Sequence, residues 1–332
     1  MKNLRILSIL DDFTYQNLKL EPYVELLTNR PFLYSKYNKI DLLLVESAWL
    51  GNQSKWRHKV ASYPNHPKRN INDLKKLVLW CKNHNIPTVF WNKEDPYHYD
   101  QFIEAAQLFD YIFTTDELSL SQYAIDAPHS KATTLTFFIQ PQLHFRKNNI
   151  TPIKRTLFTG TYQKNRLDHR TLWQNKIFEA AAPYGLDLYN RHINKSDYEF
   201  PELSGDVHYF NPISYSKIVD IYRSYQQILN VNTIVQSPTM FSRRLIEVMA
   251  CGRLVISNPS LSIQNLFPEM CLEITADDEA STLFEQLQYG YSIQQKNMIN
   301  YAYEHVHQHY TAKEWLKKLL KYCNIDHAYL SL

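Results

Sequence analysis

Glycine is scarce in this chain of 332 residues, and the scarcity excludes two common kinds of nucleotide site. Only 6 glycines are present, and they form neither a GxGxxG string nor a GxxxxGK(S/T) string. The first string lets the backbone approach a dinucleotide pyrophosphate, and the second wraps the phosphates of a nucleoside triphosphate. The sequence therefore lacks the signatures of nicotinamide-dependent dehydrogenases and of P-loop NTPases.

Cysteines are few and long apolar runs are missing. The 4 cysteines, at positions 81, 251, 271 and 323, are far apart and form no CxxC pair. This spacing predicts reduced, structural thiols in a cytoplasmic protein. The apolar run Leu4–Leu10 stops at Asp11 and Asp12, so it is too short for a signal sequence or a membrane span. We therefore expect any membrane contact, for instance at the inner face of the membrane, to be peripheral.

The charge of the chain is mild. A formal net charge of +3 and a pI near 8.4 do not call for a nucleic-acid partner, although they favour an anionic substrate or an anionic membrane surface. With 44% hydrophobic and 21% charged residues, the composition is that of a globular protein. The length is sufficient for two domains with separate cores.

Short apolar runs alternate with amphipathic stretches along the chain, which predicts an α/β fold with parallel sheets. In the first half, strands are predicted at 4–10, 40–46, 88–91, 111–115 and 131–138, and helices at 71–84 and 101–109. After a polar, proline-marked break at 140–152, strands are predicted at 155–159, 186–189, 228–231, 254–257 and 271–275, and helices at 167–182, 215–225, 242–250, 280–289, 293–309 and 312–323.

The most informative segment runs from Asn230 to Asn258. A strand end with Asn232 leads through Ser237 and Thr239 to a helix, which ends at Gly252 before a β-branched strand. The N-terminus of such a helix suits a diphosphate, and a carboxylate one turn further can accept hydrogen bonds from two vicinal hydroxyls.

Two charged side chains on this helix allow two interpretations of the segment. Arg243 and Glu247 fit the phosphate and ribose of a nucleotide sugar, but they also fit an ordinary salt-bridged helix face, because i,i+4 ion pairs are common. The Ser-Pro-Thr entry and the Ala-Cys-Gly exit favour the first interpretation.

This segment resembles the donor-site signature of group 1 GT-B glycosyltransferases, in particular of the CgeB-like (spore-maturation-protein-like) family. In the wider superfamily, two glutamates eight positions apart flank the helix; the first contacts the sugar and the second the ribose. Glu247 matches the second glutamate, so the resemblance implies ribose binding, whereas Thr239 stands in place of the first.

A second segment supports the resemblance. The string Gly160-Thr161-Tyr162 is followed by a basic stretch with Arg166, as in CgeB-like proteins. A glycine at a strand end lets a ligand approach the main chain, and an arginine can neutralise a pyrophosphate. We therefore expect Gly160, Tyr162 and Arg166 in the nucleotide site, although charge runs near loops are often just exposed.

Charged groups also follow the strands of the first half. Glu46 precedes Ser-Ala-Trp, and a Trp-Asn-Lys string precedes Glu94, Asp95 and His98. Both strings resemble CgeB-like and related capsule-cluster glycosyltransferases, which extends the resemblance over nearly the whole chain. Dense charge after apolar strands is hard to explain by packing alone. We expect Glu94 or Asp95, with His98 and Glu46 nearby, to act on the acceptor hydroxyl.

The resemblance implies a GT-B-like fold: two Rossmann-like doubly wound domains facing each other across a cleft. The expected parts are an acceptor domain over residues 1–145, a nucleotide-donor domain over residues 152–310, and a C-terminal helix over residues 311–332 that crosses back to the first domain. Because cations and helix amides can hold the leaving group, we expect neither a metal nor another cofactor.

Three functions remain open from the sequence. The first is transfer of a sugar from a nucleotide sugar to a hydroxyl of an oligosaccharide or lipid-linked glycan acceptor, which the resemblance places in capsule or cell-wall polysaccharide synthesis. The second is transfer of a phospho-polyol from a CDP-activated donor. The third is a catalytically silent nucleotide-binding scaffold, which the charged strand ends in both halves disfavour.

Overall fold

The computed structural model describes residues 3–28, 30–163, 168–192 and 198–332, which form two compact units. Unit 1 comprises residues 1–140, 237–240 and 311–332, and unit 2 comprises residues 141–236 and 241–310. Each unit contains a six-stranded sheet in which every described pairing is parallel. The prediction of two Rossmann-like sheets is therefore confirmed.

In unit 1 the strand order is β2-β1-β3-β4-β5-β6. The strands are β1 (Leu4–Ile9), β2 (Val24–Thr28), β3 (Leu42–Glu46), β4 (Thr88–Asn92), β5 (Tyr111–Thr114) and β6 (Lys131–Thr134). The central strands β3 and β4 are buried along their whole length, because helices cover the sheet. The connecting helices are α1 (Asp12–Leu18), α2 (Asn72–Asn83), α3 (Tyr99–Ala106) and α4 (Leu120–Asp126), with short 3-10 turns η1 (Tyr34–Lys36) and η2 (Glu117–Ser119).

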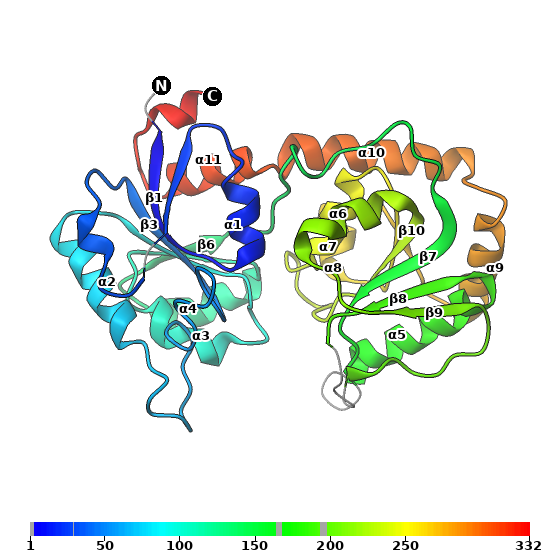
Figure 1. The fold of residues 1–332 in the computed structure, drawn as a ribbon, viewed down its shortest axis with the longest axis horizontal. Helices are drawn as coiled ribbons and strands as arrows, with labels where there is room; N and C mark the ends of the chain where they lie inside the picture. The colour runs from blue at the N-terminus through cyan, green and yellow to red at the C-terminus, as the bar shows by residue number, and fades with distance from the viewer. Residues whose placement is uncertain (1–2, 29, 164–167, 193–197) are drawn as a thin grey trace. The chain divides into compact units, whose positions relative to one another are not determined.

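The end of the chain also belongs to unit 1. Helix α11 (Ala312–Tyr322) starts at Thr311, whose side chain caps it, and the 3-10 turn η5 (Ala328–Ser331) follows. Trp315 packs edge-on against Trp91 and donates its indole N–H to the Thr136 carbonyl at 3.0 Å. Figure 1 shows the N- and C-terminal segments in the same unit.

In unit 2 the strand order is β12-β11-β10-β7-β8-β9. The strands are β7 (Ile153–Gly160), β8 (Leu186–Asn190), β9 (Val207–Phe210), β10 (Tyr225–Asn230), β11 (Leu254–Ser257) and β12 (Leu272–Glu273). The helices are α5 (Asp168–Ala181), α6 (Tyr215–Ser224), α7 (Arg243–Ala250), α8 (Leu261–Leu266), α9 (Asp277–Leu287) and α10 (Ile293–His309), with a 3-10 turn η3 (Ala182–Tyr184).

Both sheets contain a point where the connectivity reverses direction. In unit 1 this point lies between β1 and β3, and in unit 2 between β7 and β10. In open parallel sheets, ligands bind beyond the carboxyl ends of the strands at such a point. The residues that follow β1, β3, β7 and β10 are therefore the ones that decide function. Among the described residues, no helix is long and apolar enough to cross a bilayer.

Candidate functional site

The carboxyl ends of β7 and β10 in unit 2 carry most of the predicted nucleotide residues. Helix α7 begins close by, because the backbone N–H of Ser242, its N-terminal flanking residue, donates to Asn232 Oδ1 at 2.8 Å. The loop after β10 is thereby tied to the start of the helix. The amide groups at the N-terminus of α7 thus lie next to the strand ends.

Glu247 lies one turn into α7 and is buried, with an exposed fraction of only 2%. Its Oε1 atom is 2.9 Å from Arg243 Nε, accepts a hydrogen bond from the Tyr215 hydroxyl at 2.8 Å, and lies 3.7 Å from His144 Nε2. The guanidinium of Arg243 also lies over the Tyr215 ring. The three contacts hold the Glu247 carboxylate through Oε1, and a carboxylate held in this way can accept further hydrogen bonds from ligand hydroxyls.

Arg244, the next residue, points to the other side of the site. Its Nη2 group donates to the carbonyl of Thr159 at the end of β7, and its guanidinium lies over the Phe158 ring. A Cβ atom at Gly160 would lie 2.8 Å from that Nη2 atom and 3.0 Å from the Phe158 ring. Gly160 therefore makes room for Arg244, whereas the sequence had suggested that it makes room for the ligand itself.

Arg170 in α5 adds a second cation to this place. Burial, followed by the neighbouring charges of Arg244 and Arg191, lowers the pKa of Arg170 to about 10. Among the described residues, no acceptor reaches the buried Nε atoms of Arg170 and Arg244. An anion bound here would relieve the repulsion among these guanidinium groups. Arg166, the arginine chosen from the sequence, lies outside the described residues.

Two other predicted nucleotide residues use their polar atoms inside the protein. Asn232 is buried; besides holding Ser242, it donates its backbone N–H to Asn258 Oδ1 at 2.7 Å. Tyr162 is buried in the core of unit 2, and its hydroxyl donates to Asn175 Oδ1 at 2.9 Å. Both residues are therefore engaged by protein partners inside unit 2.

Ser237 and Thr239 lie in the short segment that belongs to unit 1. The Ser237 hydroxyl donates to Asp116 Oδ1 at 2.5 Å. The Thr239 hydroxyl donates to the Thr115 carbonyl at 3.0 Å and accepts the Glu117 backbone N–H at 2.8 Å. Their hydroxyls are thus engaged at the end of β5, and Thr239 holds the chain where the related signature has a glutamate.

In unit 1, Glu46 belongs to a buried charge network at the point where the connectivity reverses. The Lys93 ammonium lies 3.0 Å from Glu46 Oε1 and 3.2 Å from Asp11 Oδ2. Burial raises the pKa of Glu46, and the Lys93 ammonium opposes this effect. Burial alone would also raise the pKa of Asp11, but Lys93 and the backbone N–H groups of Gly51 and Leu50 lower it. Two carboxylates share one ammonium, which fixes the ends of β1, β3 and β4.

Asp95 is also fully buried. Its carboxylate accepts hydrogen bonds from Asn92 Nδ2 at 2.6 Å, the Thr114 hydroxyl at 2.6 Å and the Tyr123 hydroxyl at 2.8 Å. Burial raises the pKa of Asp95 to about 7, although the Thr114 and Tyr123 hydroxyls act against the rise. The side chain organises the turn after β4, and all three of its partners come from unit 1.

Glu94 and His98 are the partly exposed members of the predicted acceptor group. Their Oε2 and Nε2 atoms are 4.0 Å apart, and both side chains keep about a quarter to a third of their surface accessible, at 26% and 31%. The His98 ring packs edge-on against Trp49 and Tyr97. An acid, an imidazole and two aromatic rings thus gather at the carboxyl end of β4.

Several residues of the site escaped the sequence analysis. Tyr215 and His144 approach Glu247 from 32 and roughly a hundred positions away in the sequence, and no local pattern signals them. Lys93 is the lysine of the Trp-Asn-Lys string before Glu94, and the sequence assigned it no role. Its partners Asp11 and Glu46 lie at the ends of β1 and β3, far from it in the sequence.

A family model described as "Glycosyl transferase-like" matches residues 170–321, which include Arg170, Arg243, Arg244 and Glu247. Among proteins with curated functions, none is significantly similar to this chain.

Solved structures of low sequence identity share the fold. A glycosyltransferase from Rickettsia africae ESF-5 is 12% identical, with a TM-score of 0.54 and coverage of 97% of this chain and 98% of that chain. Anabaena Alr3699/HepE, solved in complex with UDP-glucose, is 13% identical, with a TM-score of 0.56 and coverage of 96% and 91%. Sucrose-phosphate synthase from Thermosynechococcus elongatus is 12% identical, with a TM-score of 0.54 and coverage of 95% and 85%.

At these identities the structures establish the two-sheet fold alone. The chain has the GT-B fold of two parallel sheets, and its residues 170–321 match the glycosyl transferase-like family.

Proposed function

We propose that this protein transfers a sugar from a nucleotide-sugar donor to a hydroxyl group of a surface glycan, and that it belongs to the CgeB-like branch. The observation that carries the proposal is the pairing in unit 2 of a buried carboxylate, Glu247, with a group of crowded arginines at the carboxyl end of β7. A nucleoside diphosphate offers both complements, vicinal ribose hydroxyls and two phosphates.

In this arrangement Glu247 accepts hydrogen bonds from the ribose, and Arg243 holds the carboxylate in place through their 2.9 Å contact. Arg170 and Arg244, with the N-terminal amides of α7, hold the diphosphate. These groups also stabilise the charge that develops when the bond between the sugar C1 atom and the diphosphate oxygen breaks. The negative charge of the departing nucleoside diphosphate is thus balanced by the arginines and the helix amides.

Unit 1 supplies the acceptor side of the proposal. Glu94, in contact with His98, takes the proton of the acceptor hydroxyl, whose oxygen forms the new bond to C1. Trp49 and Tyr97 offer aromatic faces beside this base, which suits a sugar ring. Asp95 and Glu46 are buried on protein partners and act as positioning residues for this segment.

The acceptor is an oligosaccharide or lipid-linked glycan of a capsule or cell-wall polymer, in line with the resemblance stated above. Among the donor bases, uridine is the first to test, because the Anabaena relative was solved with UDP and with UDP-glucose.

Calorimetric titration with two ligand pairs separates the two halves of the donor site. UDP compared with uridine isolates the phosphate contacts, and UDP compared with its 2′,3′-dideoxy analogue isolates the ribose contacts. Arg244→Ala should weaken the binding of UDP and leave the affinity for uridine unchanged. Glu247→Gln should abolish the preference for UDP over the dideoxy analogue. Arg69→Ala, an exposed arginine of unit 1, is the matched control.

Failure of UDP, CDP, GDP and dTDP to bind the wild-type chain would refute the proposal. Equal ribose discrimination in Glu247→Gln and wild type would refute the role of Glu247 alone. If CDP binds and CDP-activated polyols but no nucleotide sugar are consumed, the alternative phospho-polyol transfer replaces sugar transfer.

A further inference from the structure

The positive charge of the protein is concentrated in its first quarter. Residues 1–83 hold 14 Lys and Arg against 7 Asp and Glu, whereas residues 84–332 hold 22 against 26. The net charges are therefore +7 and −4. Such an asymmetry indicates an anionic partner for the basic part more specifically than the total charge of +3 does.

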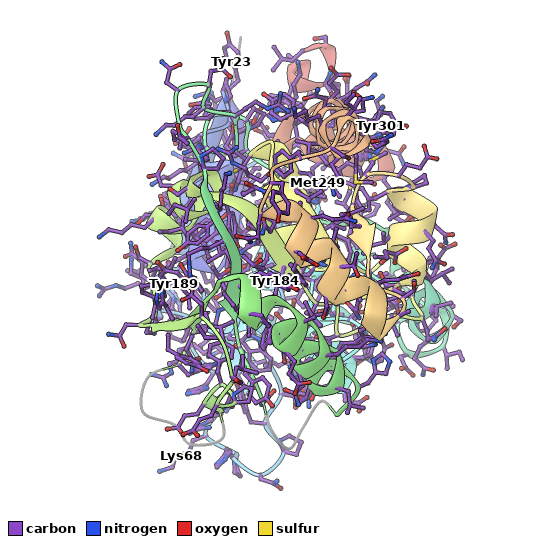
Figure 2. All side chains as sticks on the ribbon, turned by 90° about the vertical axis from the view of Figure 1, so that its right-hand side faces the viewer. Tyr23, Lys68, Tyr184, Tyr189, Met249 and Tyr301 are labelled. Carbon is purple, nitrogen blue, oxygen red and sulfur yellow. The ribbon has the colours of Figure 1, made fainter. Side chains whose placement is uncertain are left out.

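Two acid-free segments account for this excess. No Asp or Glu occurs from residue 26 to residue 40, or from residue 47 to residue 72. The second segment is a loop with 5 Lys and Arg that extends from the sheet of unit 1, and Lys68 marks its outer part in Figure 2. The first segment contains η1 and packs against α2, since the Tyr34 ring contacts the Trp80 ring at 5.3 Å.

Large apolar side chains are exposed among these cations. Phe32 is 58% exposed, Leu33 51% and Leu79 60%. The Lys76 ammonium of α2 lies 5.1 Å from the centre of the Phe32 ring, so the residue at the entry to η1 lies against this helix. Leu79 follows Lys76 by three positions and therefore lies on the same side of α2. We call the exposed apolar and basic side chains of these two adjoining segments the basic-apolar patch: Phe32, Leu33, Lys36, Lys39, Lys76 and Leu79.

We propose that the basic-apolar patch docks unit 1 onto an anionic phospholipid surface. Exposed apolar side chains gain free energy by entering the headgroup region, while lysines beside them bind the lipid phosphates. Nucleic acid is the other common polyanion. Proteins bind its bases by stacking aromatic side chains on them, and the leucine side chains of Leu33 and Leu79 cannot stack in this way. The mixture of aliphatic side chains and lysines therefore fits a lipid surface.

The energetics suit a reversible association. One Lys or Arg close to an anionic membrane strengthens binding by about fivefold, so the three lysines of the patch give roughly a hundredfold. The basic loop 47–72 adds a longer-range attraction that salt screens. Docking would keep the protein beside lipid-linked glycans.

Vesicle sedimentation tests the proposal with the full chain. Phosphatidylcholine vesicles with and without phosphatidylglycerol serve as the probe, at low and at high salt. The wild type should bind the anionic vesicles at least about tenfold more tightly than the neutral ones, and high salt should reduce this preference. Serine at Phe32, Leu33 and Leu79, and separately glutamate at Lys36, Lys39 and Lys76, should each reduce binding by at least about tenfold.

Matched variants control for general hydrophobicity and net charge. The apolar control places serine at the exposed positions Ile125, Tyr289 and Ile293, and the charge control places glutamate at the exposed positions Lys217, Lys296 and Lys321. Both controls should bind vesicles like the wild type, and circular dichroism checks that every variant is folded.

Three results would overturn the proposal: equal binding to neutral and anionic vesicles, a control variant that loses as much as the patch variant, or binding of a single-stranded DNA oligonucleotide without binding of vesicles. The patch variants should bind UDP with the same affinity as the wild type, so the vesicle test is independent of the donor site.

Discussion

Replacing Gly160 with alanine tests the geometry of the donor site most sharply, because the structure states what the added methyl group would meet. The new Cβ atom would lie 2.8 Å from Arg244 Nη2 and 3.0 Å from the Phe158 ring. Both distances are too short for ordinary contact, and the phenylalanine is buried in the core, so the arginine must move.

The magnitude follows from the contacts that Arg244 loses. A hydrogen bond from a charged donor to the Thr159 carbonyl contributes about 1.5 kcal/mol at a partly exposed site, and the contact with the Phe158 ring adds about 0.5–1 kcal/mol. The free energy of unfolding should fall by about 2 kcal/mol, as urea denaturation will measure. If the displaced arginine no longer reaches the diphosphate, UDP affinity should fall by roughly 10–100-fold, with uridine affinity unchanged.

Two comparisons complete the experiment. Gly290→Ala changes a glycine with a positive φ of 102° and no neighbouring atoms within 4 Å, so it should cost some stability and leave nucleotide affinity unchanged. The double variant with Arg244→Ala should lose no more UDP affinity than Arg244→Ala alone, because both changes act through one contact. Wild-type UDP affinity in Gly160→Ala, or full additivity in the double variant, would refute the reasoning.

Three further predictions concern unit 1. The pKa of Asp95, about 7 in the folded state, lies above its ordinary value of 3.8, so its contribution to stability is complete below pH 4 and is lost as the pH rises through 7. The stability of the wild type relative to Asp95→Asn should therefore fall by roughly 2–3 kcal/mol from pH 5 to pH 8 in urea denaturation, and a flat difference would contradict this. Lys93→Ala leaves the buried Glu46 and the partly buried Asp11 without their ammonium and should destabilise the protein by about 3–5 kcal/mol. The added change Glu46→Gln should restore part of the loss, and no recovery would exclude the shared-ammonium network. Trp315→Ala should lower the free energy of unfolding by about 3–5 kcal/mol, because its ring is buried against Trp91 and Phe138. Thermal or urea unfolding measures this loss, and a value below about 1 kcal/mol would show that α11 contributes little to unit 1.

The strongly apolar and strongly periodic segments were predictable from the sequence. The strand at Leu254–Ser257 and the helix at Ile293–His309 have the predicted bounds. Two edge strands were missed: β2 and β9 are only partly buried and carry polar residues, so their patterns resemble loops. The strand predicted at 131–138 ends at Thr134, because the carbonyls of residues 135 and 136 accept hydrogen bonds from two tryptophan indoles.

The site was predictable where its chemistry is local. Arg243 and Glu247 are four positions apart on one helix, and their ion pair follows from that spacing. The contact of Arg244 with Thr159 joins residues 85 positions apart, so only the fold shows that Gly160 serves the arginine. For the same reason, the sequence did not show that Asp95 and Glu46 are buried on protein partners while Glu94 and His98 stay accessible.

A crystal structure of the chain with bound UDP is the most direct test of the donor site. The account predicts phosphate oxygens within hydrogen-bond distance of Arg170 and Arg244, and ribose hydroxyls on the Glu247 carboxylate. A nucleotide bound away from the carboxyl ends of β7 and β10, or bound there with its ribose turned away from Glu247, would contradict it.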